Sequence, residues 1–192
     1  MSKFLLAGLG NPGSDYQGTR HNIGYDMVDA FAYKHGGLYK SSRLADRAEL
    51  KWKGKLIICI RPTTYMNLSG LAVKYWLDKE KISLENLLVL VDEIALPLTK
   101  MRLRPGGSPA GHNGLISIEE VLGTDKYPRL RFGVGNDFPA GRQVEHVLGK
   151  WKESEWPLVR LKIEKSTEII EAFLQMGIEK AMNQYNKLEI TL

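Results

Sequence analysis

The chain has 192 residues, with 27 Lys or Arg against 22 Asp or Glu and a formal net charge of +5. This length fits one domain, residues 1–192, that is large enough to bury a substantial core. The basic balance is compatible with an anionic partner but does not require one. No apolar run can span a bilayer, and residues 4–7 are too short for a signal peptide, so we expect no membrane partner and a cytoplasmic location.

Cys59 is the only cysteine, and it lies inside the apolar run 56–60. A lone cysteine there cannot form an internal disulfide, which favours a small core residue in a reducing compartment. The spacing of Cys59 and the histidines does not match a metal-ligand motif, so the sequence predicts no metal site. The four histidines are His21, His35, His112 and His146.

Hydrophobic periodicity predicts strands and helices that alternate along the chain. From the N-terminus, the predicted elements are a strand at 3–9, a helix at 23–35, a hairpin of strands at 45–52 and 55–61, a helix from about 67 to 79, a strand at 87–91, an edge strand at 98–103, a helix after 112–113 to about 122, a strand at 129–135, a long helix from 154 and a last helix at 178–186. The alternation indicates an α/β fold, and the hairpin and the edge strand make its sheet mixed. We therefore expect one domain with a mixed, twisted central sheet surrounded by helices.

Four loops rich in Asn, His and Gly lie beside these elements, at 8–13, 19–22, 62–67 and 111–114. Asn collects at caps and turns because its amide competes for backbone hydrogen bonds. If the four loops converge at one end of the sheet, they offer amide groups, imidazole and flexible backbone. That combination suits a site that binds a polar substrate and moves a proton.

Gly8, Gly10 and Gly13 match the G-x-G-x-x-G pattern of dinucleotide-binding proteins. That pattern needs a helix directly after the glycines and an acid after the second strand. Here residues 14–22 separate the glycines from the helix, and no acid follows the hairpin strand. A tight turn that needs positive φ explains the glycines more simply, and a nucleotide-cofactor enzyme stays as an alternative.

His21 follows a polar stretch, and Asp92 ends the predicted buried strand. A loop histidine by itself is more often a surface or capping residue, but a carboxylate partner makes it suitable as a general base. Glu93 competes with Asp92 for that partnership. No Ser or Cys has the context of a nucleophile, so we expect water, deprotonated by His21, to be the attacking group.

The glycine-rich loop 106–114 is either a plain linker in which Asn113 caps a helix, or a mobile lid in which the Asn113 amide meets a substrate carbonyl. Basic residues alternate on the two strands that flank this loop, so each pair shares a face. They form either a solvated face or, with Lys100, a phosphate-binding patch. These residues are Arg102, Arg104, Arg129 and Arg131.

Six motifs in order, over essentially the whole chain, resemble the bacterial peptidyl-tRNA hydrolase family. The motifs lie at 8–13, 19–24, 62–70, 92–97, 111–115 and 129–135. The resemblance implies cleavage of the ester between a peptide and the 3′-terminal ribose of tRNA, in peptidyl-tRNA with a blocked amino group. It also implies a monomer without a metal or organic cofactor. A non-catalytic RNA-binding module, as in a plant branch of the family, is the alternative, and the His21–Asp92 pair argues against it.

The family's pattern places the catalytic histidine at His21 and its carboxylate partner at Asp92. The implied substrate-binding residues are Asn11, Tyr16, Tyr65, Met66, Asn67, His112 and Asn113. The implied tRNA phosphate contacts are Arg102, Arg104 and Arg131. Whether Asn67 or Asn113 serves the oxyanion stays open. Ala95 and Ala110 depart from the commonest pattern, and Ala110 puts the motion of the lid loop in doubt.

Overall fold

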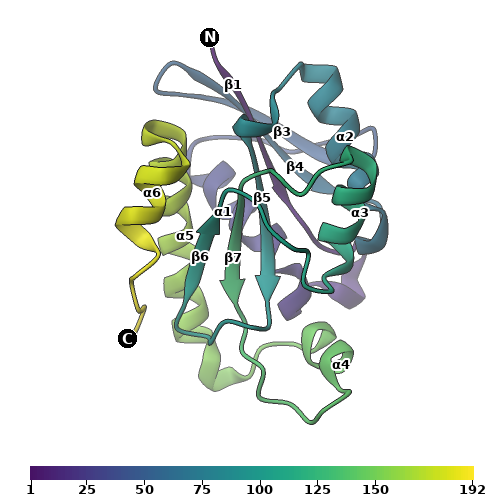
Figure 1. The fold of residues 1–192 in the computed structure, drawn as a ribbon, viewed down its shortest axis with the longest axis vertical. Helices are drawn as coiled ribbons and strands as arrows, with labels where there is room; N and C mark the ends of the chain where they lie inside the picture. The colour runs from purple at the N-terminus through teal and green to yellow at the C-terminus, as the bar shows by residue number, and fades with distance from the viewer.

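The computed structural model describes residues 1–192 and contains one seven-stranded sheet with six helices around it (Figure 1). The order of the strands across the sheet is β2-β3-β4-β1-β5-β7-β6. The strands are β1 (Lys3–Gly8), β2 (Lys40–Ser42), β3 (Ala45–Trp52), β4 (Lys55–Pro62), β5 (Leu87–Glu93), β6 (Met101–Arg104) and β7 (Arg129–Gly133). The helices are α1 (Ile23–Lys34), α2 (Ser69–Glu80), α3 (Asn113–Leu122), α4 (Gln143–Leu148), α5 (Trp156–Met176) and α6 (Ile178–Tyr185).

The four central strands, β4, β1, β5 and β7, are parallel to one another. The strands β3 and β2 join one edge antiparallel, and β6 joins the other edge antiparallel. The predicted mixed sheet is thus confirmed, and the predicted hairpin is β3–β4. Because the central strands are parallel, the loops that follow β1, β4, β5 and β7 gather at one end of the sheet.

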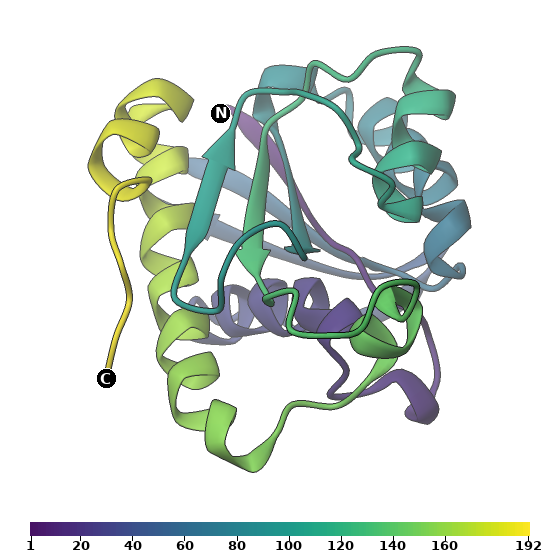
Figure 2. The same ribbon diagram turned by 60° about the horizontal axis from the view of Figure 1, so that its bottom comes forward.

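Helices cover both faces of the sheet in two layers, with α1, α5 and α6 on one face and α2 and α3 on the other (Figure 2). Successive side chains of β1 alternate between the two faces. Leu6 packs in the cluster that includes α1 and α5, and Leu5 packs in the cluster that includes α2 and α3. Parallel strands buried on both faces read as continuous apolar runs, which is why residues 4–7 and 87–91 are apolar throughout.

The exposed edge of β6 is closed by a side chain. Asn186, just after α6, accepts a hydrogen bond from the backbone N–H of Leu103 at 2.8 Å and donates one to the Leu103 carbonyl at 2.9 Å. The amide thus pairs with β6 as the backbone of another strand would. This contact protects the edge from pairing with a second chain.

Two elements were not predicted, β2 and α4. β2 has three residues and α4 has six, and no residue of α4 is buried. Periodicity detects an apolar stripe that faces the core, so a short element without such a stripe leaves no signal. No helix of the protein is long and apolar enough to cross a membrane.

The glycines at the end of β1 and after it are only partly explained by turn geometry. Gly13 has φ +103°, as expected for a turn, but Gly8 and Gly10 do not have positive φ. A Cβ on Gly8 would lie 2.2 Å from the carbonyl oxygen of Gly24 in α1, and a Cβ on Gly10 would lie 2.8 Å from the ring of Tyr25. These two glycines therefore let α1 approach β1 closely, which corrects the sequence interpretation.

Candidate active site

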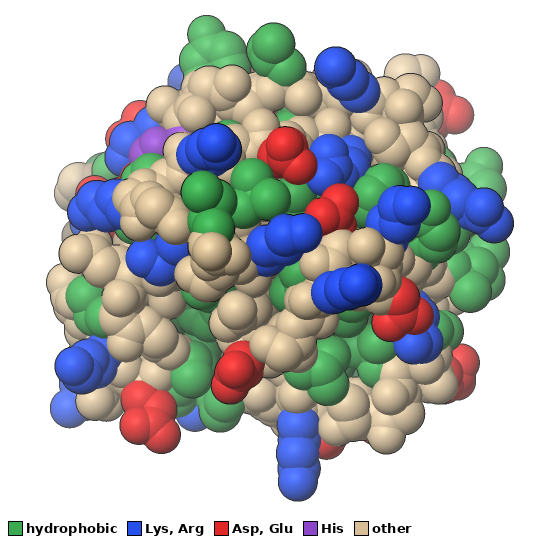
Figure 3. Space-filling view, turned by 90° about the horizontal axis from the view of Figure 1, so that it is seen from above, with side chains coloured by type: hydrophobic (Ala, Val, Ile, Leu, Met, Phe, Trp, Pro, Cys, Tyr) green, Lys and Arg blue, Asp and Glu red, His purple; other side chains and the backbone are tan.

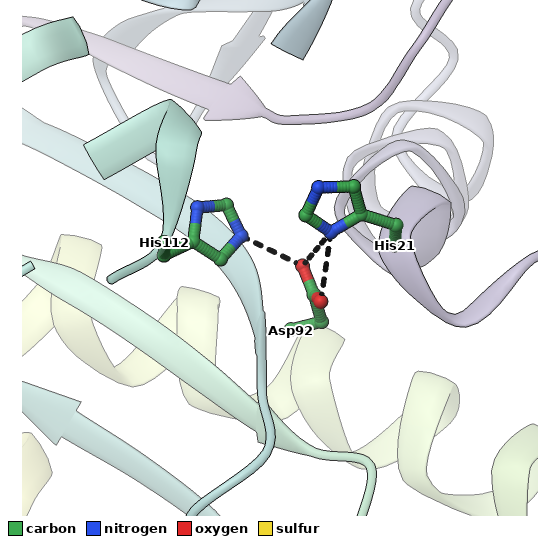
Figure 4. Close-up of side chains that lie close together, drawn as sticks. All are labelled: His21, Asp92 and His112. Carbon is green, nitrogen blue, oxygen red and sulfur yellow. Dashed lines mark hydrogen bonds and ion pairs between the residues drawn. The ribbon is translucent and has the colours of Figure 1, made fainter. Parts of the chain in front are cut away.

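Asp92, His21 and His112 meet at the C-terminal end of β5 (Figure 4). His21 comes from the short turn Arg20–Asn22 that precedes α1, and His112 is the residue before α3. His21 Nδ1 lies 2.9 Å from Asp92 Oδ2 and 3.1 Å from Oδ1, and His112 Nε2 lies 2.8 Å from Oδ1. The structure therefore brings together residues that are 71 and 20 positions apart in the sequence.

The Asp92 carboxylate is almost completely buried, since its side chain is only 2% exposed. Burial by itself raises the pKa of this carboxyl group, but the neighbouring His112 and His21 side chains outweigh that effect and lower its pKa. Asp92 is thus ionised and accepts hydrogen bonds from two rings. An anion in this place orients an imidazole and stabilises the imidazolium that forms when the imidazole takes a proton.

The protonation of the His112 ring is fixed by helix α3. The backbone N–H groups of Gly114 and Leu115 donate to His112 Nδ1, at 3.1 and 3.4 Å. Because Nδ1 accepts these bonds it carries no proton, so the proton of the neutral ring is on Nε2 and is donated to Asp92. His112 is therefore the N-cap of α3 and a donor to Asp92 at the same time.

His21 is oriented differently and keeps one nitrogen free. Its Nδ1–H donates to Asp92, so the lone pair of the neutral ring is on Nε2. Nε2 forms no hydrogen bond within the protein. The side chain is 12% exposed and faces a cavity of about 110 Å³. Such a cavity is large enough to admit water beside the ring.

His21, Asp92 and His112 also form a group of possible metal ligands, whose donor atoms all lie within 4.8 Å of one another. A metal on His112 Nε2 would need the lone pair of that nitrogen, which would move the proton of the neutral ring to Nδ1. There it would point at the N–H groups of Gly114 and Leu115, donor against donor. The donor geometry of His112 therefore fits a hydrogen-bond network better than a metal centre.

Glu93, the competing carboxylate, lines the same cavity but forms no hydrogen bond or ion pair with His21. It forms an ion pair with Arg131, whose guanidinium also donates to the carbonyl of Ser108 at 2.9 Å. Successive side chains of a strand point to opposite faces, so Asp92 and Glu93 cannot both reach the same ring. The strand geometry thus selects Asp92 as the partner of His21.

The loops that follow β1 and β4 are joined beside this centre. Asn11 Oδ1 accepts a hydrogen bond from the backbone N–H of Met66 at 2.7 Å. Asn22 fixes the backbone of Asn11 by accepting from its N–H and donating to its carbonyl, each at 2.9 Å. Met66 in turn packs against the loop before α3, since a Cβ on Gly114 would lie 2.7 Å from its sulfur. The four Asn- and His-bearing loops therefore converge at one end of the sheet. Asn22 was not singled out from the sequence, although it lies in the His21 motif.

Of the remaining residues implied to bind substrate, only Asn113 lines the cavity beside this centre. Asn67 and Asn113 are exposed, and their amide groups form no hydrogen bond within the protein. Asn113 lines the same cavity as His21, whereas Asn67 does not. Tyr16 and Tyr65 lie together with ring centroids 6.3 Å apart, and Tyr65 is 57% exposed. These groups are available to a ligand rather than used by the fold.

The cavity has a second wall that the sequence did not predict. The lining residues on this wall belong to α4 and are Gln143, Val144 and Val147. The other lining residues are His21, Asp92, Glu93, Ile94 and the loop Ala110–Asn113. Ala110 has φ +49°, a left-handed conformation that a glycine adopts without strain.

The basic residues on β6 and β7 do not form one group. Arg129 is buried, and its guanidinium donates to the backbone carbonyls of Gly107, Asp125 and Tyr127, so it lies on neither a solvated nor a phosphate-binding face. Arg102 lies opposite Arg131 in the sheet. Arg102 and Arg104 have no protein partner, and Arg104 is exposed. Figure 3 shows the end of the molecule opposite to the C-terminal ends of β5 and β7. There Lys and Arg side chains lie among acidic and hydrophobic ones and do not form one basic patch.

Comparison with known proteins identifies the family of the chain. The sequence profile of the peptidyl-tRNA hydrolase family matches residues 5–191. Peptidyl-tRNA hydrolase of Parabacteroides distasonis is 49% identical over 184 residues, which cover 96% of this chain and 98% of that protein. That of Bacteroides fragilis is 47% identical over 185 residues, covering 96% and 99%. The crystal structure of peptidyl-tRNA hydrolase from Acinetobacter baumannii superposes with a TM-score of 0.91 at 34% identity, covering 97% of this chain and 95% of that one. With this sheet, these converging loops and matches of this extent, the chain belongs to the peptidyl-tRNA hydrolase family.

Proposed function

We propose that His21 is the general base of this enzyme and that it activates water for attack on the ester of peptidyl-tRNA. The reaction itself, hydrolysis of peptidyl-tRNA, follows from membership of the family. The observation that carries the assignment of the base is the contact of His21 Nδ1 with the buried Asp92 carboxylate at 2.9 Å. That contact leaves Nε2 with its lone pair directed away from Asp92. A general base needs such an unshared lone pair in order to accept a proton.

The steps use only a water molecule and these side chains. His21 Nε2 takes a proton from water while the oxygen of that water attacks the ester carbonyl carbon. Asp92 stabilises the resulting imidazolium. The tetrahedral intermediate then expels the ribose oxygen, which takes the proton back from His21. The products are the peptide with a free carboxyl group and tRNA with a free 3′-terminal hydroxyl.

Asn113 is the better candidate for the oxyanion, and Asn67 for the peptide backbone. Asn113 lines the cavity beside His21 with a free amide, so its N–H₂ group can donate to the carbonyl oxygen as charge develops there. Asn67 is next to Met66, whose backbone is held by Asn11. Pairing of the peptide with Asn11 and Asn67 explains discrimination against free aminoacyl-tRNA. Free aminoacyl-tRNA has no peptide group there, so it would leave the polar groups of Asn11 and Asn67 unpaired. Tyr16, Tyr65, Met66 and His112 complete the walls around the acyl group.

Arg102, Arg104 and Arg131 are proposed to contact the tRNA phosphates. Arg102 and Arg104 carry no neutralising partner, and Arg102 faces Arg131 across two neighbouring strands. Arg131 is held by Glu93, so its position is fixed before any phosphate arrives. One arginine held by Glu93 and two arginines without a partner together suit a phosphate backbone. The tRNA backbone would bind to them through its charge, and this binding would position the ester at His21.

We also propose that the enzyme works as a monomer in the cytoplasm, where tRNA is used. His21, Asp92 and His112 all come from one chain, so the proposed chemistry needs no residue of a second one. Light scattering of the purified protein should give a mass near 21.7 kDa. A stable dimer would contradict the monomer without affecting the chemistry.

Incubation with N-acetylaminoacyl-tRNA, beside unblocked aminoacyl-tRNA, tests the proposal directly. We expect release of the N-acetylamino acid by the wild-type protein and little release from the unblocked substrate. The His21→Ala variant should bind the same tRNA without cleaving it. A wild-type protein that binds tRNA but does not hydrolyse the ester would instead be an RNA-binding module.

A further inference from the structure

Arg20, the residue directly before His21, is buried to 5% exposure and has no role in the chemistry above. We propose that Arg20 is a positioning residue that holds α4 in place as the second wall of the reaction cavity. This inference rests on the proposed role of His21, because it concerns the geometry of the same site. It adds a specific side chain that connects the base to the wall facing it.

The Arg20 guanidinium connects three segments of the chain. Its Nη1 donates to the carbonyl of His146 in α4 at 3.1 Å, and its Nη2 donates to Glu155 Oε1 at 3.0 Å. Its central carbon lies over the Trp151 ring, 5.3 Å from the ring centroid. The planar, forked guanidinium donates in two fixed directions and stacks on an aromatic ring, which a lysine ammonium cannot do at once.

The backbone beside Arg20 joins the same region. The Arg20 N–H donates to the Gly149 carbonyl at 3.0 Å, and Thr19 forms an isolated β-bridge with Lys150. A Cβ on Gly149 would lie 3.0 Å from Arg20 Nη1, so the glycine lets the guanidinium approach the chain closely. The end of α4 is therefore fitted around this arginine.

Few other interactions hold α4. None of its residues is buried, and Val144 is 62% exposed. Its other polar and aromatic contacts include a hydrogen bond from His146 Nε2 to the Val134 carbonyl at 3.1 Å, a stack of His146 on Phe138 and an exposed ion pair between Arg142 and Glu145. Helices usually owe their position to an apolar face packed on the core, which α4 lacks. The polar contacts of Arg20 therefore carry much of what fixes α4.

The position of α4 matters because Gln143, Val144 and Val147 line the same cavity as His21. Any substrate that places its ester at His21 lies against this wall. A displaced wall loses contacts with the substrate in the ground state and the transition state alike, and loss of such shared binding raises KM. Arg20 is next to His21 in the chain, so it sets the position of the wall relative to the base.

The Arg20→Lys variant tests the proposal, with Arg142→Gln as the matched control. Lysine keeps the positive charge near Glu155 but cannot also reach His146. Arg142 lies just before α4, is 60% exposed and pairs with Glu145.

For Arg20→Lys we expect KM for N-acetylaminoacyl-tRNA to rise on the order of tenfold. The pH midpoint of kcat/KM should not move, because His21 and Asp92 keep their contact. Backbone amides of 143–149 should exchange with solvent faster than in the wild type. Arg142→Gln should change none of these quantities.

Gly149→Ala provides a second variant in case Arg20→Lys does not fold. Gly149 has φ −79°, so alanine causes no backbone strain there, and its methyl group would lie closest to the Arg20 guanidinium and to two carbonyls of α4. KM and amide exchange should change in the same direction as in Arg20→Lys.

Unchanged KM and unchanged exchange in a folded Arg20→Lys variant would overturn the proposal. A lower kcat with a shifted pH midpoint at constant KM would overturn it too, because Arg20 would then act on His21. An inactive wild-type protein would contradict the proposed function, while amide exchange would still report on α4.

Discussion

His112 Nε2 lies 2.8 Å from Asp92 Oδ1, so the carboxylate that orients His21 is itself held by a second imidazole. The His112 ring is in turn fixed by the N–H groups at the start of α3. The proposed base, His21, therefore depends on a chain of hydrogen bonds that runs from a helix terminus through His112 and Asp92. Each member of this chain has a distinct and measurable role.

Two substitutions separate the roles of His112. Asparagine can still accept from the N-terminal amides of α3 but does not replace the donor to Asp92, whereas alanine removes both interactions. Both variants should lower kcat by roughly tenfold, as loss of one hydrogen bond to a charged group implies. His112→Ala should also be less stable to unfolding than His112→Asn by about 1 kcal/mol. Wild-type turnover in both would show that Asp92 needs only His21.

His21→Ala should leave a folded protein and reduce hydrolysis by at least about 100-fold, since a general base contributes on that order. The side chain is at the cavity surface, not in a hydrophobic cluster, so thermal unfolding should change little. Single-turnover rates with N-acetylaminoacyl-tRNA, measured beside circular dichroism, give the answer. Activity near that of the wild type would remove His21 from the mechanism.

Asp92→Asn should lower turnover strongly and change substrate affinity less, because an amide lacks the charge that stabilises imidazolium. Glu93→Gln is the control on the same strand: it frees Arg131 and should act mainly on tRNA binding. Asp92 also affects stability in acid. Its folded pKa is lowered, so its stabilising contribution is complete above its ordinary pKa and is lost as pH falls below it. Denaturant titrations below pH 4 should show less pH dependence for Asp92→Asn, and equal turnover in the two variants would refute the assignment.

Alanine variants of Arg102, Arg104 and Arg131 should weaken tRNA binding and flatten its salt dependence. Each phosphate contact contributes about −0.9 to the slope of log K against log salt on duplex. A minimal substrate with only the 3′-terminal nucleoside should be affected little. Binding of the His21→Ala protein to tRNA over a salt series measures the slope. If the triple variant keeps the wild-type slope, the tRNA contacts another face.

Lys162 should make the protein more stable as pH rises. It is fully buried in α5, donates to the Gly133 carbonyl at 2.7 Å, and burial lowers its pKa from 10.5 to about 6. Between these two values the unfolded chain binds a proton that the folded protein does not, so unfolding becomes less favourable with increasing pH. Lys162→Met should flatten this rise in unfolding free energy between pH 6 and 10. Lys165→Met, at a partly exposed ion pair on the same helix, is the control and should retain it.

The sequence alone determined most of the secondary structure, because local periodicity reports which side of an element faces the core. The strand 87–91 and the helix from 154 are examples, since each has a long and regular apolar pattern. The motifs also determined the family, and with it His21 and Asp92 as candidates. Asn and Gly loops are visible without a structure because their chemistry is local.

Only the tertiary structure decided which candidates act together. The choice of Asp92 over Glu93 depends on the face to which β5 points each side chain, and a shift of one residue would reverse it. The proton position on His112 depends on a helix terminus, and the burial of Arg129 depends on carbonyls of distant loops. α4 has no buried face, so its place beside His21 follows from contacts with Arg20, 126 residues away from His146. Such contacts join segments that are far apart in the chain, and no local pattern of residues encodes their geometry.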